Sequence, residues 1–269
     1  MPKLLTDEQV AAYHRDGIVF PMRVLSEEQA ASLLDASNDL EQRIGENAKA
    51  TDLAQMHLHF RWAYDLVVNP QILDAVEDVL GPNIVGWATG LFPKQPNDPK
   101  FISWHQDGTY WNLDTHDVVT AWIALSPATI ENGCMRVIPG THKLPIQPHT
   151  DTYAADNLLS RGQEIGMEID DNDAIDIVLD PGEMSLHHVK IVHGSNGNES
   201  DTKRVGFTVR YVPTACAQTG HRPQAILARG EDTFGHFEFI GPPPELPVDE
   251  AVAAMQASAQ QQLESVMKK

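Results

Sequence analysis

The chain has 269 residues, of which 42% are hydrophobic and 21% charged, a balance that supports a sizeable core and excludes global disorder. Its formal net charge of −19, from 19 basic and 38 acidic residues, argues against a nucleic-acid or anionic-membrane partner, because both require clustered Lys and Arg. Two cysteines exclude a disulfide scaffold, and neither a signal peptide nor an apolar run of roughly 20 residues is recognised, so we expect no membrane span and a cytoplasmic location.

The first third of the chain is predicted to be helical. Residues 6–9 (TDEQ) and 26–29 (SEEQ) each combine a hydroxyl cap with an acidic first turn, which is typical of helix N-termini. Gly17 and Pro21 are expected to end the first of these helices. Residues 70–80 form a third amphipathic pattern, which stops at a Gly-Pro pair. We expect these helices to pack on the outside of a sheet core.

From residue 84 onward the sequence changes to short β-type runs separated by Gly, Pro, Asn and Asp. The predicted strands are residues 84–92, 118–125, 134–138, 174–178, 184–188 and 204–212. This pattern favours a mainly β sandwich or jelly roll with flanking helices over a Rossmann fold. Residues 143–173 are acidic and irregular and are expected to act as a lid, and residues 248–269 to form a closing helix. No linker stands out, so residues 1–269 are expected to form one domain.

A candidate metal site lies in residues 103–110 (SWHQDGTY). Residues two apart on a strand project to the same face, so His105 and Asp107 are expected to reach one metal ion from a single strand. His193 offers a third ligand from elsewhere in the chain. Two imidazoles and one carboxylate form the facial triad of non-haem iron(II) oxygenases, which leaves three coordination positions open.

Cationic side chains follow the third candidate ligand. Arg204 comes eleven residues after His193 and opens an apolar alternating strand, a position from which a buried guanidinium can grip a dicarboxylate. Arg210 shares the strand parity of Arg204 and is a candidate for holding an anionic substrate group. His187 and His188 are rivals of His193, but only one of them can face inward because they are neighbours on a strand.

At these residues the sequence resembles the phytanoyl-CoA dioxygenase family of Fe(II)/2-oxoglutarate-dependent oxygenases. The resemblance runs from about Thr6 to Pro242. It is most specific in residues 104–107 (WHQD), in residues 131–142 (ENGCMRVIPGTH), and in residues 193–195 (HGS) followed by the arginine eleven positions after the histidine. The resemblance implies a double-stranded β-helix, a cupin-like jelly roll, in agreement with the strand pattern.

The resemblance also implies an activity. His105, Asp107 and His193 would bind Fe(II), and 2-oxoglutarate and O₂ would serve as cosubstrates in the oxidation of a small molecule, with release of succinate and CO₂. Similar enzymes that halogenate have a small residue in place of the aspartate, so Asp107 favours hydroxylation over halogenation.

Further site residues are implied or suggested. The resemblance implies that Arg204 binds the C5 carboxylate of 2-oxoglutarate and that Ser195 and Trp122 contact the cosubstrate. Tyr110 and Trp111 directly follow the His-X-Asp pair and are candidates, with Arg210, for contacts to the substrate.

Two other interpretations remain open on the residues. One is a cupin-like metalloenzyme that does not use 2-oxoglutarate, a class that does not need Arg204. The other is a non-catalytic protein that binds 2-oxoglutarate or another metabolite, which need not keep all three metal ligands. A free small molecule is favoured over an acyl-CoA as substrate, because no basic cluster is available for the CoA phosphates.

Overall fold

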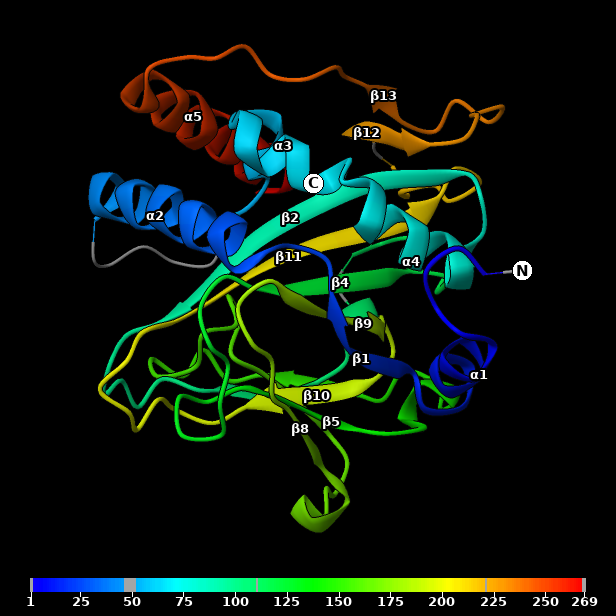
Figure 1. Ribbon diagram of the computed structural model, residues 1–269, viewed down its shortest axis with the longest axis vertical. Coiled ribbons are helices and arrows are strands. Elements are labelled where there is room, and N and C mark those ends of the chain that lie inside the picture. The colour runs from blue at the N-terminus through cyan, green and yellow to red at the C-terminus, as the bar shows by residue number, and fades with distance from the viewer. Residues whose placement is uncertain (1, 46–51, 110, 221, 268–269) are drawn as a thin grey trace.

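The computed structural model describes residues 2–45, 52–109, 111–220 and 222–267, and within them two β-sheets face each other. In spatial order, the larger sheet consists of β1 (Ile18–Arg23), β9 (Glu183–His188), β4 (Val119–Ala124), β11 (Arg204–Pro213), β2 (Ile84–Lys94), β12 (Gln224–Arg229) and β13 (Glu238–Phe239). The smaller sheet consists of β3 (Ile102–His105), β10 (Val192–Ser195), β5 (Met135–Ile138) and β8 (Ile175–Ile177). Figure 1 shows the smaller sheet below the larger one. This arrangement is the double-stranded β-helix that the sequence predicted.

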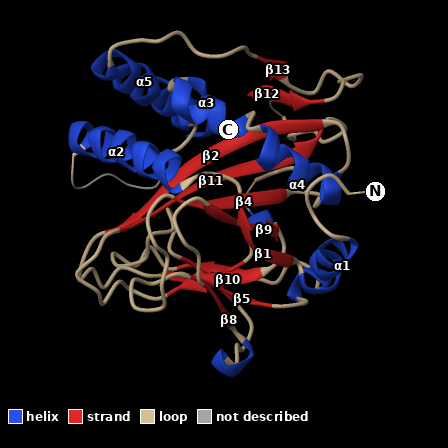
Figure 2. Cartoon of the chain, in the orientation of Figure 1, coloured by secondary structure: helices blue, strands red, loops and turns tan. Residues whose placement is uncertain are grey.

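Helices cover the outer face of the larger sheet (Figure 2). They are α2 (Glu27–Ile44), α3 (Arg61–Val67), α4 (Pro70–Leu80) and α5 (Val248–Met267), whereas α1 (Asp7–Asp16) lies beside the edge strand β1. The predicted start of α1 is confirmed, because the Thr6 hydroxyl accepts from the backbone of Gln9 at 3.2 Å and the Gln9 side chain accepts from the backbone of Thr6 at 2.8 Å. Ser26 and Gln29 make the same reciprocal pair before α2, at 3.1 and 2.8 Å.

The prediction for Pro21 is wrong. Gly17 does end α1, in a left-handed conformation with φ of 79°, but Pro21 lies inside β1. β1 is the edge strand of the larger sheet, and its register shifts between Val19 and Met22. Proline is tolerated at such a place because an edge strand does not need every backbone donor.

The two faces of the larger sheet pack against different partners. On the outer face, the hydroxyl of Tyr211 in β11 donates to the carbonyl of Val67 in α3 at 3.0 Å. A Cβ at Gly86 in β2 would lie 2.2 Å from the Val67 side chain, so the glycine lets α3 approach the sheet. On the inner face, Trp122 from β4 joins a separate apolar cluster with Met135 and other residues of the smaller sheet. The central strands are therefore buried on both faces.

Residues 143–173 are less irregular than expected. They contain a two-stranded hairpin, β6 (His149–Asp151) with β7 (Gln163–Ile165), and the short 3₁₀ helix η4 (Asp171–Asp173). Their role as a lid remains a prediction.

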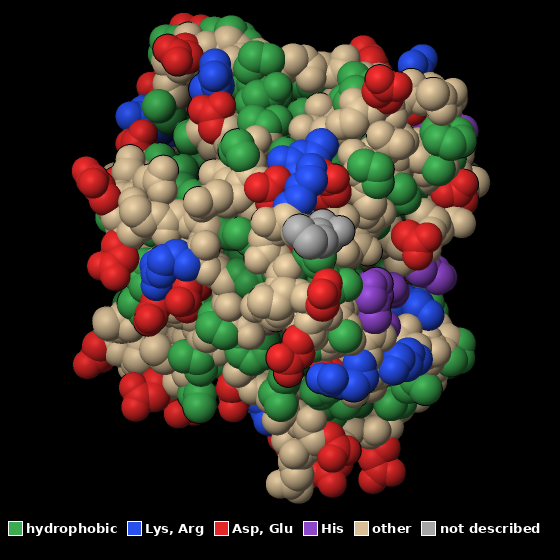
Figure 3. Space-filling view, turned by 45° about the vertical axis from the view of Figure 1, so that its right-hand side comes forward, with side chains coloured by type: hydrophobic (Ala, Val, Ile, Leu, Met, Phe, Trp, Pro, Cys, Tyr) green, Lys and Arg blue, Asp and Glu red, His purple; other side chains and the backbone are tan. Residues whose placement is uncertain are grey.

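Acidic side chains are spread over the face shown in Figure 3, whereas Lys and Arg gather at a few places, one of them beside histidines. Among the described residues, no helix combines the length and the apolar character that crossing a membrane requires.

Candidate functional site

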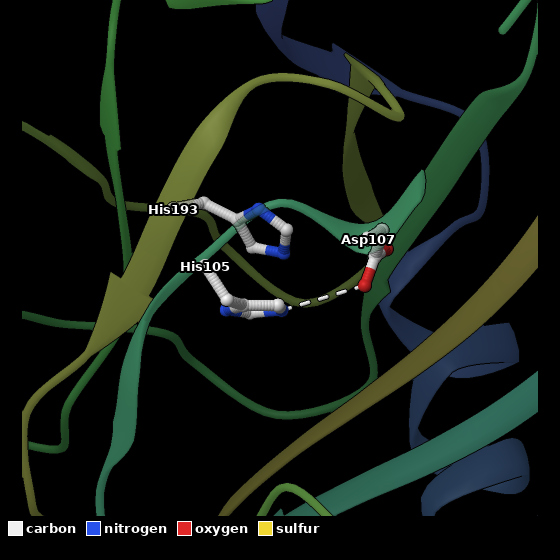
Figure 4. Close-up of side chains that lie close together, drawn as sticks. All are labelled: His105, Asp107 and His193. Carbon is white, nitrogen blue, oxygen red and sulfur yellow. Dashed lines mark ion pairs between the residues drawn. The ribbon is translucent and has the colours of Figure 1, made fainter. Parts of the chain in front are cut away.

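Three of the predicted residues meet between the two sheets. His105 ends β3 and is paired in register with His193 of β10, and the centroids of their rings lie 4.1 Å apart. The carboxylate of Asp107 lies opposite the two rings (Figure 4), with Oδ1 3.4 Å from Nε2 of His105. One potential ligand atom from each of the three residues lies within 4.8 Å of the other two. The structure thus brings together the donor set expected from the sequence.

The route by which Asp107 reaches the site differs from the prediction. β3 ends at His105, and Asp107 opens the 3₁₀ helix η2 (Asp107–Thr109), so the two residues do not project from a single strand. The buried side chain of Gln106 fixes this turn, since it donates to the carbonyl of Lys190 and accepts from the backbone of Gln147, both at 2.8 Å. The hydrogen bonds of the Gln106 side chain, and not a continuous strand, therefore orient His105 and Asp107.

Both histidines present a bare nitrogen to the centre. Nδ1 of His105 lies 2.9 Å from the carbonyl of Ser103, and Nδ1 of His193 lies 3.0 Å from the carbonyl of Ile191. A carbonyl only accepts, so each Nδ1 carries the proton and each Nε2 keeps its lone pair. This is the arrangement in which an imidazole binds a metal ion.

The electrostatics of the three groups fit a cation. Burial lowers the pKa of His193 to about 4, which keeps this imidazole neutral at neutral pH. Burial alone would raise the pKa of Asp107, but the contact with His105 and the positive charge of Arg210 hold the pKa well below its ordinary value. The contact between Nε2 of His105 and the Asp107 carboxylate then joins two lone-pair donors. A divalent cation between them would satisfy both.

A buried cation lies further along the inner face of the larger sheet. Arg204 is 1% exposed, and its guanidinium donates to the carbonyls of Gly133 and Phe92. It lies 5.4 Å from the centroid of the Trp122 ring, and its Nε has no partner among the described residues. Burial lowers the pKa of Arg204 to about 10, and no acidic side chain in the described part of the chain pairs with it. An unpaired buried guanidinium is suited to receive a carboxylate.

A second basic side chain, Lys94, is buried beside Arg204. It is the cross-strand partner of Arg204, and its ammonium donates to the Ser195 hydroxyl at 2.8 Å and to the carbonyl of Asn196. Burial, together with the charge of Arg204, lowers the pKa of Lys94 to about 6. The contact with Lys94 holds the Ser195 hydroxyl in place.

One cavity between the two sheets is lined by the three potential ligands together with Ser195 and Arg204. Its lining combines residues of both sheets with Leu159: Phe92, Ile102, His105, Asp107, Thr120, Trp122, Met135, Leu159, His187, His193, Gly194, Ser195, Arg204, Thr208 and Arg210. The ring of Trp122 reaches this cavity because residue 206 has no side chain: a Cβ at Gly206 would lie 2.0 Å from it.

The predicted substrate residues take different places. Arg210 lines the cavity, and its guanidinium lies 5.0 Å from the centroid of the Trp111 ring, which covers it. Tyr110 lies outside the described residues. His187 lines the cavity with its ring 5.2 Å from that of His193, but it does not belong to the group of three potential ligands found in the described residues.

Sequence reasoning did not single out Thr120 and Thr208. Strand parity was the available signal, because Thr120 lies two residues before Trp122, and Thr208 lies between Arg204 and Arg210.

Comparison with known proteins adds to this geometry. The sequence model of the family described as Phytanoyl-CoA dioxygenase (PhyH) matches residues 13–206. The peroxisomal phytanoyl-CoA dioxygenase of Bos taurus is 33% identical over 154 residues, covering 55% of this chain and 45% of that protein. A probable alpha-ketoglutarate-dependent hypophosphite dioxygenase of Stutzerimonas stutzeri is 28% identical over 156 residues, covering 58% of this chain and 54% of that protein. The chain thus spans about half the length of the curated relatives it matches.

A solved structure matches almost the whole chain. The non-heme monooxygenase ThoJ, in its apo form, superposes with a TM-score of 0.82 at 31% identity, covering 97% of this chain and 99% of that chain. The arrangement of sheets and helices is therefore shared along nearly the full length of both chains.

Proposed function

The chain belongs to the phytanoyl-CoA dioxygenase family, and on this premise we propose that it is an Fe(II)- and 2-oxoglutarate-dependent oxygenase that oxidises a small molecule. The observation that carries the proposal is one cavity that holds both the His105, Asp107 and His193 group and the unpaired buried guanidinium of Arg204. When bound, the iron supplies the activation of O₂ that couples decarboxylation of 2-oxoglutarate to oxidation of the substrate.

The side chains of this chain hold and orient these groups. His105, Asp107 and His193 bind the iron, with the Nδ1–H groups of both histidines fixed on backbone carbonyls so that Nε2 faces the metal. Arg204 binds the C5 carboxylate of 2-oxoglutarate. Ser195, held by Lys94, and Trp122 contact the same cosubstrate from the cavity wall.

The identity of the third ligand favours one type of outcome. The carboxylate of Asp107 would bind the iron at a position that similar halogenating enzymes leave to chloride, so we propose hydroxylation or a related oxidation rather than halogenation. The buried guanidinium of Arg204 supports a 2-oxoglutarate-dependent enzyme over a cupin-like enzyme without this cosubstrate, because a buried cation without an anionic partner is costly.

The names of the relatives support a small-molecule substrate without fixing it. One is named for phytanoyl-CoA and the other for hypophosphite. Relatives of this chain are thus named for chemically distant substrates, so we expect selectivity to come from the part of the cavity outside the metal ligands and Arg204.

The test is an anaerobic titration of the protein with Fe(II) and 2-oxoglutarate, followed by the visible charge-transfer band of their chelate. We expect the band in the wild type and in the control Arg61→Met, which removes an exposed cation whose ion pair is with Asp65. In Arg204→Met, the 2-oxoglutarate concentration needed for half of the band should rise about a hundredfold, because a charge-assisted contact is lost. Absence of the band from wild-type protein that has bound iron would refute the assignment.

A further inference from the structure

Three polar side chains form a row across the larger sheet, beside the metal ligands. Arg210 of β11 is paired in register with Thr120 of β4, and Thr120 is paired with His187 of β9. All three line the cavity that contains the metal ligands. Residues in register on adjacent strands point to the same face, so the row presents its polar atoms together.

Each member of the row has a buried polar atom without a partner among the described residues. These atoms are Nε of Arg210, Oγ1 of Thr120 and Nδ1 of His187. Thr120 is 1% exposed and His187 is 2% exposed. Buried polar groups in proteins are hydrogen-bonded in the large majority of cases, and leaving one unpaired is costly. Three such atoms on one wall of one cavity point to a ligand that accepts hydrogen bonds.

Arg210 is held in position without being neutralised. Its guanidinium lies over the Trp111 ring and donates to the Thr208 hydroxyl at 3.5 Å, a long contact. Among the described residues it forms no ion pair, and the Asp107 carboxylate is instead in contact with His105.

The charges in the cavity leave Arg210 in excess. The metal brings two positive charges and Arg204 one; Asp107 brings one negative charge and 2-oxoglutarate two. These sum to zero. Lys94 is engaged with the Ser195 hydroxyl and the Asn196 carbonyl and does not line the cavity. The positive charge of Arg210 is then without a counterpart in a low-dielectric site, where a single negative charge would be favoured.

We infer that Arg210, Thr120 and His187 form a subsite for the oxyanion head of a small substrate, an assignment that rests on the proposed function. Arg210 supplies charge-assisted donors, the Thr120 hydroxyl supplies a neutral donor, and His187 supplies a third from whichever ring nitrogen carries its proton. The group to be oxidised lies on the metal side of this anchor. Carboxylates and phosphorus oxyanions share the chemistry that the row recognises.

The experiment measures binding of small anions to the anaerobic complex of the full chain with Fe(II) and 2-oxoglutarate. The probes are acetate, propionate and methylphosphonate, each paired with its neutral counterpart: acetamide, propionamide and dimethyl methylphosphonate. Isothermal titration calorimetry gives the affinity, and perturbation of the chelate band shows that the probe binds next to the metal. Because 2-oxoglutarate already occupies Arg204, the titration reports on the remaining cation.

We expect at least one anion to bind saturably and its neutral counterpart to bind at least about tenfold more weakly. Arg210→Gln should weaken the anion about 10- to 100-fold while the chelate band persists, and Thr120→Val, which preserves shape and charge, should weaken it by about threefold or more. The control Arg61→Gln should bind as the wild type does. The ratio of carboxylate to phosphonate affinity then tells which head group the subsite prefers.

Three results would overturn the subsite: no anion binds to wild-type protein that forms the band, each neutral counterpart binds as tightly as its anion, or Arg210→Gln binds the anion unchanged. If Arg210→Gln does not fold, an unchanged affinity in Thr120→Val overturns it instead. Failure of the band itself in the wild type refutes the proposed cofactors, so the two failures are distinguishable.

Discussion

The variant Arg204→Met distinguishes two effects of the buried guanidinium: its effect on the free energy of unfolding, and its contribution to the binding of 2-oxoglutarate. Arg204 is 1% exposed, and burial lowers its pKa from its ordinary value to about 10. At about 1.4 kcal/mol per pKa unit, holding the charge in the fold costs about 3 kcal/mol at every pH below that value, neutral pH included. The two hydrogen bonds to the carbonyls of Gly133 and Phe92 return about 1.5 kcal/mol each. The two contributions nearly cancel, so Arg204→Met without ligands should stay within about 2 kcal/mol of the wild-type free energy of unfolding.

The same variant should behave differently when ligands are present. At a 2-oxoglutarate concentration of about 100 times its Kd, binding stabilises the wild type by about 2.7 kcal/mol. For a chain of this size that is a rise in Tm of about 5–10 °C. Loss of the guanidinium weakens binding about a hundredfold, which reduces the 2-oxoglutarate-dependent rise in Arg204→Met to about 1–2 °C.

Anaerobic thermal unfolding with Fe(II), with and without 2-oxoglutarate, measures both quantities, and Arg61→Met is the matched control. A full ligand-dependent rise in Arg204→Met would show that Arg204 does not anchor the cosubstrate. A loss of more than about 4 kcal/mol without ligands would instead make Arg204 a structural residue.

Three further changes test the neighbouring groups. The pKa of Lys94 is about 6 in the fold and 10.5 ordinarily, so between these pH values the unfolded chain binds one proton more than the folded chain. The free energy of unfolding of the wild type should therefore rise with pH across this window, by up to about 1.4 kcal/mol per pH unit. Denaturation curves of Lys94→Met should lack this part of the rise. Gly206→Ala places a Cβ 2.0 Å from Trp122 and should lower the free energy of unfolding by about 2 kcal/mol in chemical denaturation, whereas Gly241→Ala, with nothing within 4 Å, should be neutral. Asp107→Ala should weaken Fe(II) binding at least about tenfold in a metal titration, and an unchanged affinity would remove Asp107 from the ligand set.

The sequence predicted the elements whose signals are local. Capping residues placed the starts of α1 and α2, and alternating apolar runs placed β2, β4 and β11 within a few residues of their observed ends. β1 was missed because Pro21 is a strong local signal against regular structure, and only the tertiary fact that this strand lies at a sheet edge makes the proline acceptable. β12 was missed as well, because its short run has little alternation of its own and is stabilised by pairing with β2.

The residues that meet in the candidate site could be named from the sequence, but the reasons for their positions could be predicted only in part. The expectation that His105 and Asp107 share a strand face assumed that the strand continues past His105. It ends there because the Gln106 side chain bonds to two distant loops, a long-range contact with no sequence signature. The row of Arg210, Thr120 and His187 likewise depends on the register of three strands that are far apart in sequence.

On the proposed function, β11 would separate the cosubstrate from the substrate within one cavity. Arg204 and Arg210 lie six residues apart on the same face of this strand with no register shift between them, so at about 3.3 Å per residue their Cα atoms are about 20 Å apart. Between them, Gly206 gives the Trp122 ring its place and Thr208 contacts Arg210. The metal ligands face this stretch from the smaller sheet. A substitution at position 210 can therefore change the head group that the cavity accepts without altering the guanidinium at position 204, which is how enzymes with the same metal and cosubstrate groups would diverge to chemically distant substrates.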